Sequence, residues 1–345
     1  MSFTTVWKPD MRIGFAYDLK TTFGFNADSP EDAGEEYDSP DTIQLIEGSL
    51  ASLGHQVLRF GGGQELLDNV CRQRHVDIVF NICEGRGKSS SREAQVPSIL
   101  EMLNIPYTGS SPQCLAVCLD KPLTKRILAS YGVVTPKWHV GCDKENLSEA
   151  VKEIDYFPVV VKLAHEGSSI GITNSSVAHT AEEAQALASK LISSYQQPVM
   201  FEQYIGGHEI TVGVIGGKNP YILGIMEIKP KKQSGLFMYS IEVKRDYVNQ
   251  VFYECPAKLA PDSLERLKTA SIEIFKILGC RDMARLDFRV DANGVPYFIE
   301  INPLPGLGSH SDLVIMAGLL GISHKELTDK VLSASLERYP QCAQK

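Results

Sequence analysis

A predicted hairpin with an Asn-Gly turn at residues 293–294 constrains the fold of this chain more than any other feature. An Asn-Gly pair between two strand-like runs is the strongest short signal for a β-hairpin. Counting outward from this turn places Asp287 opposite Glu300 and Arg285 opposite Asn302, with all four side chains on one face. Like charges that face each other across a strand pair are destabilising, so the two carboxylates indicate a cation between them.

The oxygen ligands of this hairpin suit Mg²⁺. That ion usually takes one or two protein carboxylates and fills its other positions with water and substrate phosphates. We therefore predict that Asp287, Glu300 and Asn302 bind metal and that the chemistry involves a nucleotide. The alternative is a solvent-facing strand pair that happens to carry acids. The loop 303–311 favours the metal site, because it is rich in proline and glycine and can bring its backbone close to a ligand.

Composition and charge argue against several classes of protein. A chain of 345 residues with 43% hydrophobic and 22% charged residues is typical of a globular protein with two or three domains. The formal charge of −8 and the lack of a dense lysine-arginine run argue against nucleic-acid binding. No apolar run approaches the ~20 residues that span a bilayer, and the N-terminus lacks the apolar core of a signal peptide, so we predict a cytoplasmic protein without membrane contact. No Cys-x-x-Cys occurs among the eight cysteines, so we expect buried, reduced thiols.

The first third of the chain alternates strand-like and helix-like runs. We predict strands at 12–17, 55–60 and 76–83, and helices at 42–53 and 65–73. Ser39 is the expected N-cap of the first helix. This alternation is typical of a parallel sheet covered by helices, whose ligands gather at the carboxyl ends of the strands. The segment 21–38 is polar and acidic, and we expect a loop at that edge, either a mobile lid or a merely solvated one.

The rest of the chain predicts two further units. A buried strand at 157–163 carries Lys162, and a strand at 199–202 leads into two glycines at 206–207 that we interpret as a hinge. Beyond the hinge we expect an antiparallel sheet that contains the metal hairpin. Further helices are predicted at 181–195, 261–278 and 325–338. The expected boundaries are 1–120 for an N-terminal α/β domain, 121–205 for a central unit and 206–345 for a C-terminal unit.

The phosphates of a nucleotide must be held here without a standard glycine-rich motif. No Gly-x-Gly-x-x-Gly is present, and the run 87–89 fails as a P-loop because Ile82 stands where the first glycine is required. Lys121 and Lys162 are candidate point charges, and the amides of loop 167–171 are candidates to fold over phosphate oxygens.

Two acids flank the expected hinge and are candidates for the nucleoside. Either Glu202 or Glu209 can accept a hydrogen bond from an adenine amino group, and the other from ribose hydroxyls. By spacing alone, both acids are interpreted as salt-bridge acids, and each lysine, taken singly, as a surface residue.

These motifs, taken in order, resemble the D-alanine–D-alanine ligases of the ATP-grasp superfamily. The similarity runs from about residue 11 to 338 and covers nearly the whole chain. Its landmarks lie at residues 106–110, 119–121, 161–162, 166–169, 202, 209–211, 244, 285–287, 300–302, 305–306 and 309–311. The resemblance implies a three-domain ATP-grasp fold of α/β and α+β type, with an N-terminal parallel α/β domain followed by two α+β domains that sandwich ATP.

The resemblance also implies roles for individual residues. For ATP it implies phosphate contacts from Lys121, Lys162 and Ser169, adenine contacts from Glu202 and the backbone near Ile205, a ribose contact from Glu209, and a contact of Lys244 with the transferred phosphate. It implies that Asp287, Glu300 and Asn302 hold two Mg²⁺ ions, with Mn²⁺ as an alternative. Arg285 is then expected to stabilise the tetrahedral oxyanion and the transferring phosphoryl group, and the loop with Ser168 to close and exclude water.

Four departures from the family pattern lie in the expected substrate cleft. The residues after the first strand lack a Ser/Glu motif, while Glu84 replaces a histidine, Arg245 a tyrosine and Asp312 a leucine. Ser309 and Ser311 stay candidates to bind the carboxylate of the amine substrate. Asp312 would repel that carboxylate unless it were paired, and Arg245 is its expected partner. These changes argue against plain D-alanine joining.

We therefore expect an ATP-dependent carboxylate-amine ligase that works through an acyl phosphate. It would join a small carboxylic acid or amino acid to an amino acid in a natural-product pathway, for example as a mycosporine-type amino acid ligase. The alternatives are an authentic D-alanine–D-alanine ligase of peptidoglycan synthesis and a non-catalytic ATP-binding regulatory protein. The retained Arg285, metal ligands and Lys244 argue against the last. The expected partners are small-molecule substrates, and a homodimer is one option because dimers are common among similar ligases.

Overall fold

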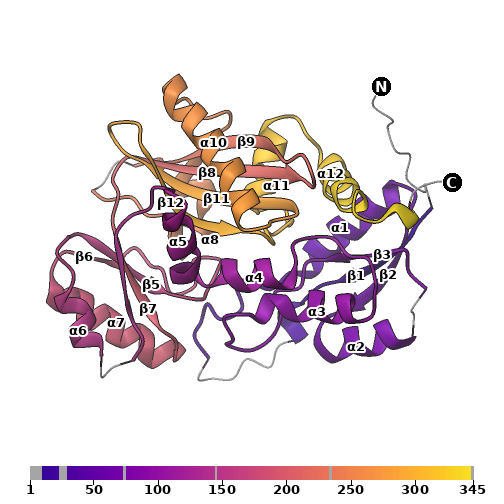
Figure 1. Ribbon diagram of the computed structural model, residues 1–345, viewed down its shortest axis with the longest axis horizontal. Coiled ribbons are helices and arrows are strands. Elements are labelled where there is room, and N and C mark those ends of the chain that lie inside the picture. Colours follow the sequence, from indigo (N-terminus) through magenta and orange to yellow (C-terminus); the bar gives the residue numbers. More distant parts are fainter. Residues whose placement is uncertain (1–9, 23–28, 73–74, 144–145, 233–234, 343–345) are drawn as a thin grey trace.

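Three sheets with their helices make up the described part of the chain. The computed structural model describes residues 10–22, 29–72, 75–143, 146–232 and 235–342. Figure 1 shows a small parallel sheet near the N-terminus, a second sheet with two helices along it, and a larger antiparallel sheet above them.

The N-terminal sheet is parallel, with the strand order β2-β1-β3. Its elements are β1 (Arg12–Ala16), α1 (Pro40–Ser52), β2 (Gln56–Gly61), α2 (Gly63–Arg72), β3 (Ile78–Asn81) and α3 (Gln95–Met102), with two short 3₁₀ helices at Lys20–Thr22 and Arg92–Ala94. As predicted, Ser39 caps α1, since its hydroxyl accepts the amide N–H of Thr42 at 3.2 Å and Pro40 takes the first helical position. Asp18 and Glu84 follow the carboxyl ends of β1 and β3 at one edge of this sheet.

The central sheet is antiparallel, with the strand order β4-β7-β5-β6. It is built from β4 (Trp138–Gly141), α6 (Leu147–Lys152), β5 (Val159–Leu163), β6 (Val177–Ala178), α7 (Ala181–Tyr195) and β7 (Val199–Gln203), and it is reached through α4 (Pro112–Leu119) and α5 (Lys121–Ser130). In the register of β5 with β7, Val160 pairs with Glu202, so Lys162 lies diagonally across from Glu202 on the same face.

The C-terminal sheet has five strands in the order β10-β9-β8-β11-β12. Its elements are β8 (His208–Gly216), β9 (Tyr221–Pro230), α8 (Ile241–Arg245), α9 (Tyr247–Gln250), β10 (Val251–Glu254), α10 (Pro261–Ile277), β11 (Asp282–Val290), β12 (Pro296–Asn302), α11 (Asp312–Leu319) and α12 (His324–Leu336), followed by a 3₁₀ turn at Pro340–Cys342. All of these strand pairs are antiparallel, as the sequence predicts.

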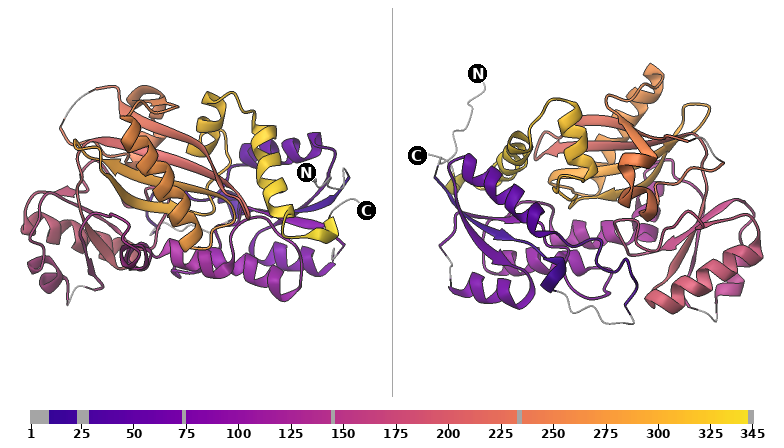
Figure 2. Two further views of the ribbon diagram at one scale, coloured as in Figure 1. Left: turned by 45° about the horizontal axis from the view of Figure 1, so that its top comes forward. Right: turned by 180° about the vertical axis from the view of Figure 1, so that it is seen from behind.

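The last helix packs against the first part of the chain. Leu332 and Leu336 of α12 share one buried hydrophobic cluster with Ile13 and Phe15 of β1. Figure 2 shows the yellow C-terminal helices beside the indigo N-terminal unit in both views. This packing joins the two ends of the chain, so the N-terminal loops lie within reach of the central and C-terminal sheets.

The cysteines differ in part from their predicted burial. All eight are free, but Cys71 and Cys142 are exposed and Cys255 is only partly buried, so the prediction of buried thiols is wrong for these three. Cys114, Cys118 and Cys280 lie together in the core, with Sγ–Sγ distances of 3.9 Å and 3.6 Å from Cys114 to the other two. Within the described residues, no helix is both long enough and apolar enough to cross a membrane.

Candidate active site

The hairpin of β11 and β12 brings the predicted metal ligands together. Asp287 pairs with Glu300 and Arg285 with Asn302, as counted from the sequence. The path to this register differs from the prediction, because Val290 pairs with Pro296 and the turn therefore takes five residues rather than two. A bulge next to Asp287 restores the alignment by leaving one extra residue in β12.

The two facing carboxylates have different electrostatic surroundings. Asp287 accepts hydrogen bonds from Arg285 at 2.9 Å and from the Thr211 hydroxyl at 2.9 Å, and burial raises its pKa to about 6 although Arg285 opposes the shift. Burial also acts to raise the pKa of Glu300, but nearby cations, led by Lys121 and then Lys162, lower that pKa to about 2. Glu300 is therefore ionised at neutral pH and stays available to a cation.

The donor set of this hairpin fits a hard divalent cation. Two carboxylates and one amide oxygen on one strand pair are oxygen ligands of the kind that Mg²⁺ prefers. The Asn302 Oδ1 accepts the Leu304 amide at 2.8 Å, which orients the amide oxygen and leaves it a second lone pair.

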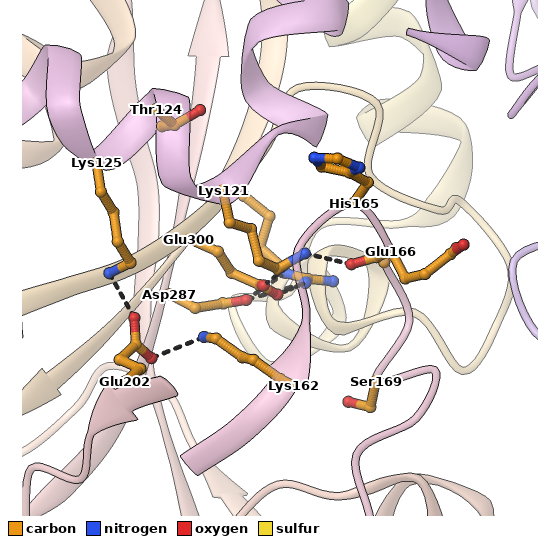
Figure 3. A network of polar contacts seen from close by, with 12 residues as sticks. Lys121, Thr124, Lys125, Lys162, His165, Glu166, Ser169, Glu202, Asp287 and Glu300 are labelled. Atoms are coloured by element: carbon orange, nitrogen blue, oxygen red, sulfur yellow. Dashed lines mark hydrogen bonds and ion pairs between the residues drawn. The ribbon is translucent and has the colours of Figure 1, made fainter. Parts of the chain in front are cut away.

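Glu202 lies between two buried lysines. Its carboxylate is 2.7 Å from the Lys162 Nζ and 2.6 Å from the Lys125 Nζ (Figure 3). Burial opposes ionisation of all three groups. Even so, the two ammonium groups lower the pKa of Glu202, and Glu202 raises the pKa of Lys162, while burial lowers the pKa of Lys125 to about 8.

The sequence analysis missed Lys125. This residue stands one helical turn after Lys121 in α5, and the i, i+4 spacing of two lysines that face β12 was the available signal. Lys125 also donates to the hydroxyl of Thr135 at 2.6 Å and to the carbonyl of Phe298 at 3.1 Å. It ties α5 to the C-terminal sheet next to Glu202.

Glu209 is held by an arginine that the sequence analysis also missed. Arg289, on β11, forms an ion pair with Glu209 and donates to the backbone carbonyl of Ile205 at 2.8 Å. Both hinge acids thus form the salt bridges that their spacing allowed, and their predicted contacts with adenine and ribose stay predictions.

One cavity collects most of the predicted nucleotide and metal residues. Eight of them line it: Lys162, Ser169, Glu202, Ile205, Glu209, Lys244, Asp287 and Glu300. Lys121 approaches the same place from α5, where its Nζ donates to the backbone carbonyl of Glu166 and lies 3.5 Å from the Glu300 carboxylate (Figure 3). The tertiary structure therefore joins β5, β7, β8, β11 and β12 around a single site.

The residues predicted to act on the transferred phosphate lie at one end of this cavity. Arg285 contacts Asp287 at 2.9 Å, Asp312 at 3.5 Å and Glu300 at 3.7 Å, which holds its guanidinium at the centre of three carboxylates. Lys244 lies over the ring of Tyr239, 5.1 Å from its centroid, and burial followed by repulsion from Arg285 lowers its pKa.

The loop 167–171 is shaped by two consecutive left-handed serines. Ser168 has φ 48° and Ser169 has φ 60°, a region that L residues seldom adopt. The Ser169 hydroxyl donates to the backbone carbonyl of Tyr239 at 3.1 Å and lines the cavity. The amides at both ends of this loop, which were predicted to bind phosphate, donate instead to carboxylates of Glu36 and Asp32.

The predicted pairing of Arg245 with Asp312 is wrong. Arg245 forms ion pairs with Glu35 at 2.8 Å and with Glu31 at 3.2 Å. Asp312 instead contacts Arg285 and accepts a hydrogen bond from the Tyr239 hydroxyl at 3.0 Å. The reason is that α8 points Arg245 towards the N-terminal segment, while Asp312 begins α11 beside β11.

The other predicted substrate residues differ in their burial and surroundings. Glu84 is partly buried near Glu93, and burial together with that carboxylate raises its pKa well above the usual range. Ser309 is exposed in the loop after β12, and Ser311 is the N-cap of α11.

The acidic segment is ordered where the structure describes it. Residues 23–28 of the predicted loop 21–38 lie outside the described residues, but residues 29–38 make specific contacts with the central and C-terminal units. The expectation of a merely solvated loop is therefore wrong for residues 29–38.

Comparison with known proteins agrees with this geometry. The family model described as D-ala D-ala ligase C-terminus matches residues 128–333. A D-alanine–D-alanine ligase of Desulforamulus reducens is 33% identical over 85% of this chain and 92% of its own. The uncharacterized protein y4sG of Sinorhizobium fredii is 32% identical over 85% of this chain and 87% of its own.

Solved structures give the same result. The D-alanine–D-alanine ligase of Bacillus anthracis complexed with ATP superposes with a TM-score of 0.70 at 26% identity, over 97% of this chain and 99% of that one. The VanG D-Ala:D-Ser ligase of Enterococcus faecalis shares the fold, with a TM-score of 0.70 at 20% identity over 94% of this chain and 99% of that one.

The fold and the site together define an ATP-grasp enzyme, an ATP-dependent ligase that joins a carboxylate to an amine through a C–N bond. Within that class, the chain belongs to the D-alanine–D-alanine ligase family.

Proposed function

We propose that this enzyme joins two amino acids through an acyl phosphate, and that both amino acids are D-alanine. The observation that carries the proposal is the convergence of Lys121, Lys162, Lys244 and Arg285 on the facing pair of Asp287 and Glu300. Cations gathered beside two metal-type carboxylates suit the charge that spreads over a phosphoryl group in transfer.

The relatives support a D-alanine–D-alanine ligase of peptidoglycan synthesis over a ligase of a natural-product pathway. The relatives from Desulforamulus reducens and Bacillus anthracis are D-alanine–D-alanine ligases, and the VanG protein of Enterococcus faecalis is a D-Ala:D-Ser ligase. A mycosporine-type role is therefore unsupported. The non-catalytic alternative is disfavoured because the chain keeps every charged group that phosphoryl transfer needs.

The residues of the site divide the proposed reaction between them. The carboxylate of the first substrate attacks the γ-phosphate of ATP, the bond from the γ-phosphorus to the β–γ bridging oxygen breaks and ADP leaves, while Lys244 and Arg285 stabilise the charge on the transferring group. The amine of the second substrate then attacks the acyl carbon, phosphate leaves, and Arg285 stabilises the oxyanion of the tetrahedral intermediate. Mg²⁺ bound at Asp287, Glu300 and Asn302 would neutralise phosphate oxygens.

The part of the cavity that takes the nucleoside is proposed to open when Glu202 and Glu209 leave their present ion-pair partners and contact ATP. Glu202 and Lys162 bind each other at 2.7 Å. ATP binding then places adenine against Glu202 and phosphates against Lys162, while Lys125 keeps Glu202 charged. Glu209 is proposed to turn from Arg289 towards the ribose. A homodimer stays a prediction.

The second substrate is where this enzyme departs most from the family pattern. Asp312 stands next to Ser311, the proposed carboxylate contact, and its charge is partly balanced by Arg285 at 3.5 Å. This observation favours a second candidate function, in which D-alanine is joined to an acceptor other than free D-alanine.

The test is product formation from defined pairs of substrates. ATP, Mg²⁺ and single or paired amino acids of both configurations are incubated with the enzyme, and the release of phosphate and the mass of the products are measured. A D-alanyl-D-alanine product confirms the main proposal. D-alanine consumed only with another amine supports the second candidate. Phosphate release without any amide from any pair overturns both.

A further inference from the structure

Residues 29–38 form an acidic strap that reaches from the N-terminal unit onto the loop 167–171. The Glu36 Oε1 accepts the amide N–H of Gly167 at 2.6 Å, and the Asp32 Oδ2 accepts the amide N–H of Gly171 at 2.8 Å. The strap therefore binds both ends of one five-residue loop with carboxylates. Hydrogen bonds to a charged acceptor are about twice as strong as neutral ones.

A buried arginine anchors the strap at the first end of the loop. The Arg92 guanidinium is 2% exposed and donates to Glu36 at 2.6 Å, to Glu166 at 2.9 Å and to the backbone carbonyl of His165 at 2.9 Å. These bonds hold Glu36 and the start of the loop in one fixed arrangement.

The second end of the loop has its own anchor. The Tyr195 hydroxyl, at the end of α7, donates to the other oxygen of Asp32 at 2.6 Å. Asp32 is thus fixed by the central unit while it holds Gly171. Each carboxylate uses one oxygen for the loop and the other for an anchor.

The loop geometry requires this close approach. A Cβ at position 167 would lie 2.7 Å from the Glu36 Oε1, so a side chain there displaces the carboxylate. Between the pinned glycines, Ser168 and Ser169 both take the left-handed conformation, which persists only where the surroundings hold it. The strap supplies that restraint, and the middle of the loop is directed into the nucleotide cavity through Ser169.

The strap also holds the second wall of the cavity. Glu35 and Glu31 pair with Arg245, the residue next to Lys244 in α8. Helix α8 is bonded in turn to the chain that leaves the loop, because the Ile241 amide donates to the Ile172 carbonyl at 3.1 Å. One N-terminal segment therefore contacts both the loop 167–171 and α8.

We propose that Glu36 and Asp32 are positioning residues that keep the loop 167–171 closed while the acyl phosphate exists. The proposal rests on the proposed function. An amine that attacks the acyl phosphate gives an amide and phosphate, whereas a water molecule that attacks it returns the original carboxylate and phosphate. The second route consumes one ATP without forming a bond, and the closed loop suppresses it by excluding water.

The test measures coupling, the amount of amide formed per phosphate released. Asp32→Ala and Glu36→Ala each remove one charge-assisted bond to the loop, and coupling should fall by about tenfold. Asp32→Asn keeps an acceptor for Gly171 and a partner for Tyr195, so its coupling should stay close to that of the unsubstituted enzyme. Glu47→Ala removes a surface ion pair with Arg59 in the same unit and serves as the control.

A second measurement tests the role of the strap even if the proposed function is wrong. Hydrogen exchange at the amides of Gly167 and Gly171 needs no substrate, and it should speed up in both alanine variants but not in Asp32→Asn. Unchanged exchange overturns the proposal, and so does a fall in amide and phosphate by equal factors. An unsubstituted enzyme that forms no amide refutes the proposed function alone, and the exchange rates still decide whether the strap holds the loop. If an alanine variant does not fold, Glu36→Gln, which keeps the Gly167 bond and loses the ion pair with Arg92, is measured instead.

Discussion

Lys162 and Glu202 form a 2.7 Å ion pair in the wall of the nucleotide cavity, although the sequence assigns them to opposite ends of ATP. Lys125 of α5 contacts the same carboxylate, so one carboxylate balances two buried ammonium groups. While no phosphate is bound, the Glu202 carboxylate offsets the cost of burying the two ammonium groups. Lys162 and Glu202 therefore both lie at the site in their ionised forms.

Glu202→Gln should destabilise the protein by about 3–5 kcal/mol, because it leaves two buried ammonium groups without a counter-ion. Urea unfolding measures this difference in the free energy of unfolding. Glu265→Gln, which breaks an exposed pair with Lys268, is the matched control and should change stability by less than about 1 kcal/mol. Equal effects of the two substitutions would show that the buried triad contributes no more than a surface pair.

Glu300→Gln should lower kcat/KM at least about 100-fold while the protein still folds. The melting temperature should fall, because the surrounding cations lose a carboxylate that they hold in its ionised form. The substitution removes the charge of a carboxylate whose pKa is about 2 but keeps its shape. Phosphate release at increasing Mg²⁺ concentrations measures the effect, and a thermal melt checks the fold. Near-normal turnover at low Mg²⁺ would refute the assignment of the metal site.

Asp312→Asn should lower the KM for an amino acid acceptor by at least about tenfold, because a like charge beside a bound carboxylate costs several kcal/mol. Asparagine keeps an acceptor for the Tyr239 hydroxyl, so the packing of α11 is preserved. Arg245→Tyr is the comparison. Since Arg245 pairs with the strap and not with Asp312, it should change coupling and leave acceptor preference unaltered. A shift in preference with Arg245→Tyr alone would contradict this division.

Asp38→Asn should stabilise the protein at pH 8 more than at pH 5. Burial, and then repulsion from Asp18, raises the pKa of Asp38 from 3.8 to about 7. A raised folded-state pKa means that the stability contribution of the carboxyl group is fully present below its unfolded pKa and is lost as pH rises through about 7. The advantage of the asparagine variant should therefore grow by about 2 kcal/mol between pH 5 and pH 8, as measured by urea unfolding. A constant or shrinking advantage would contradict the sign.

For the metal hairpin, the sequence predicted the correct pairing of residues but the wrong length of turn. Counting from an Asn-Gly turn placed Asp287 opposite Glu300, which is confirmed. The actual turn is closed by Asp291, whose carboxylate accepts the amides of Asn293 and Val295 at 2.9 Å each. The longer turn and the bulge offset each other. The alternation of side chains along a strand determines which residues share a face. The length of the turn depends instead on the hydrogen bonds of the Asp291 carboxylate, which compete with a two-residue turn.

The sequence by itself determined the family, the order of strands and helices, and most of the charged groups at the site, though not Lys125 or Arg289. Caps, alternating apolar positions and motif spacing are local properties, and local hydrogen bonding decides them. Only the tertiary structure decided which charges pair: Glu202 with Lys125, Arg245 with Glu35, and the strap carboxylates with the loop amides. Such pairs join residues far apart in the chain, and their distances follow from how α8, α5 and the N-terminal unit pack together rather than from any spacing along the sequence.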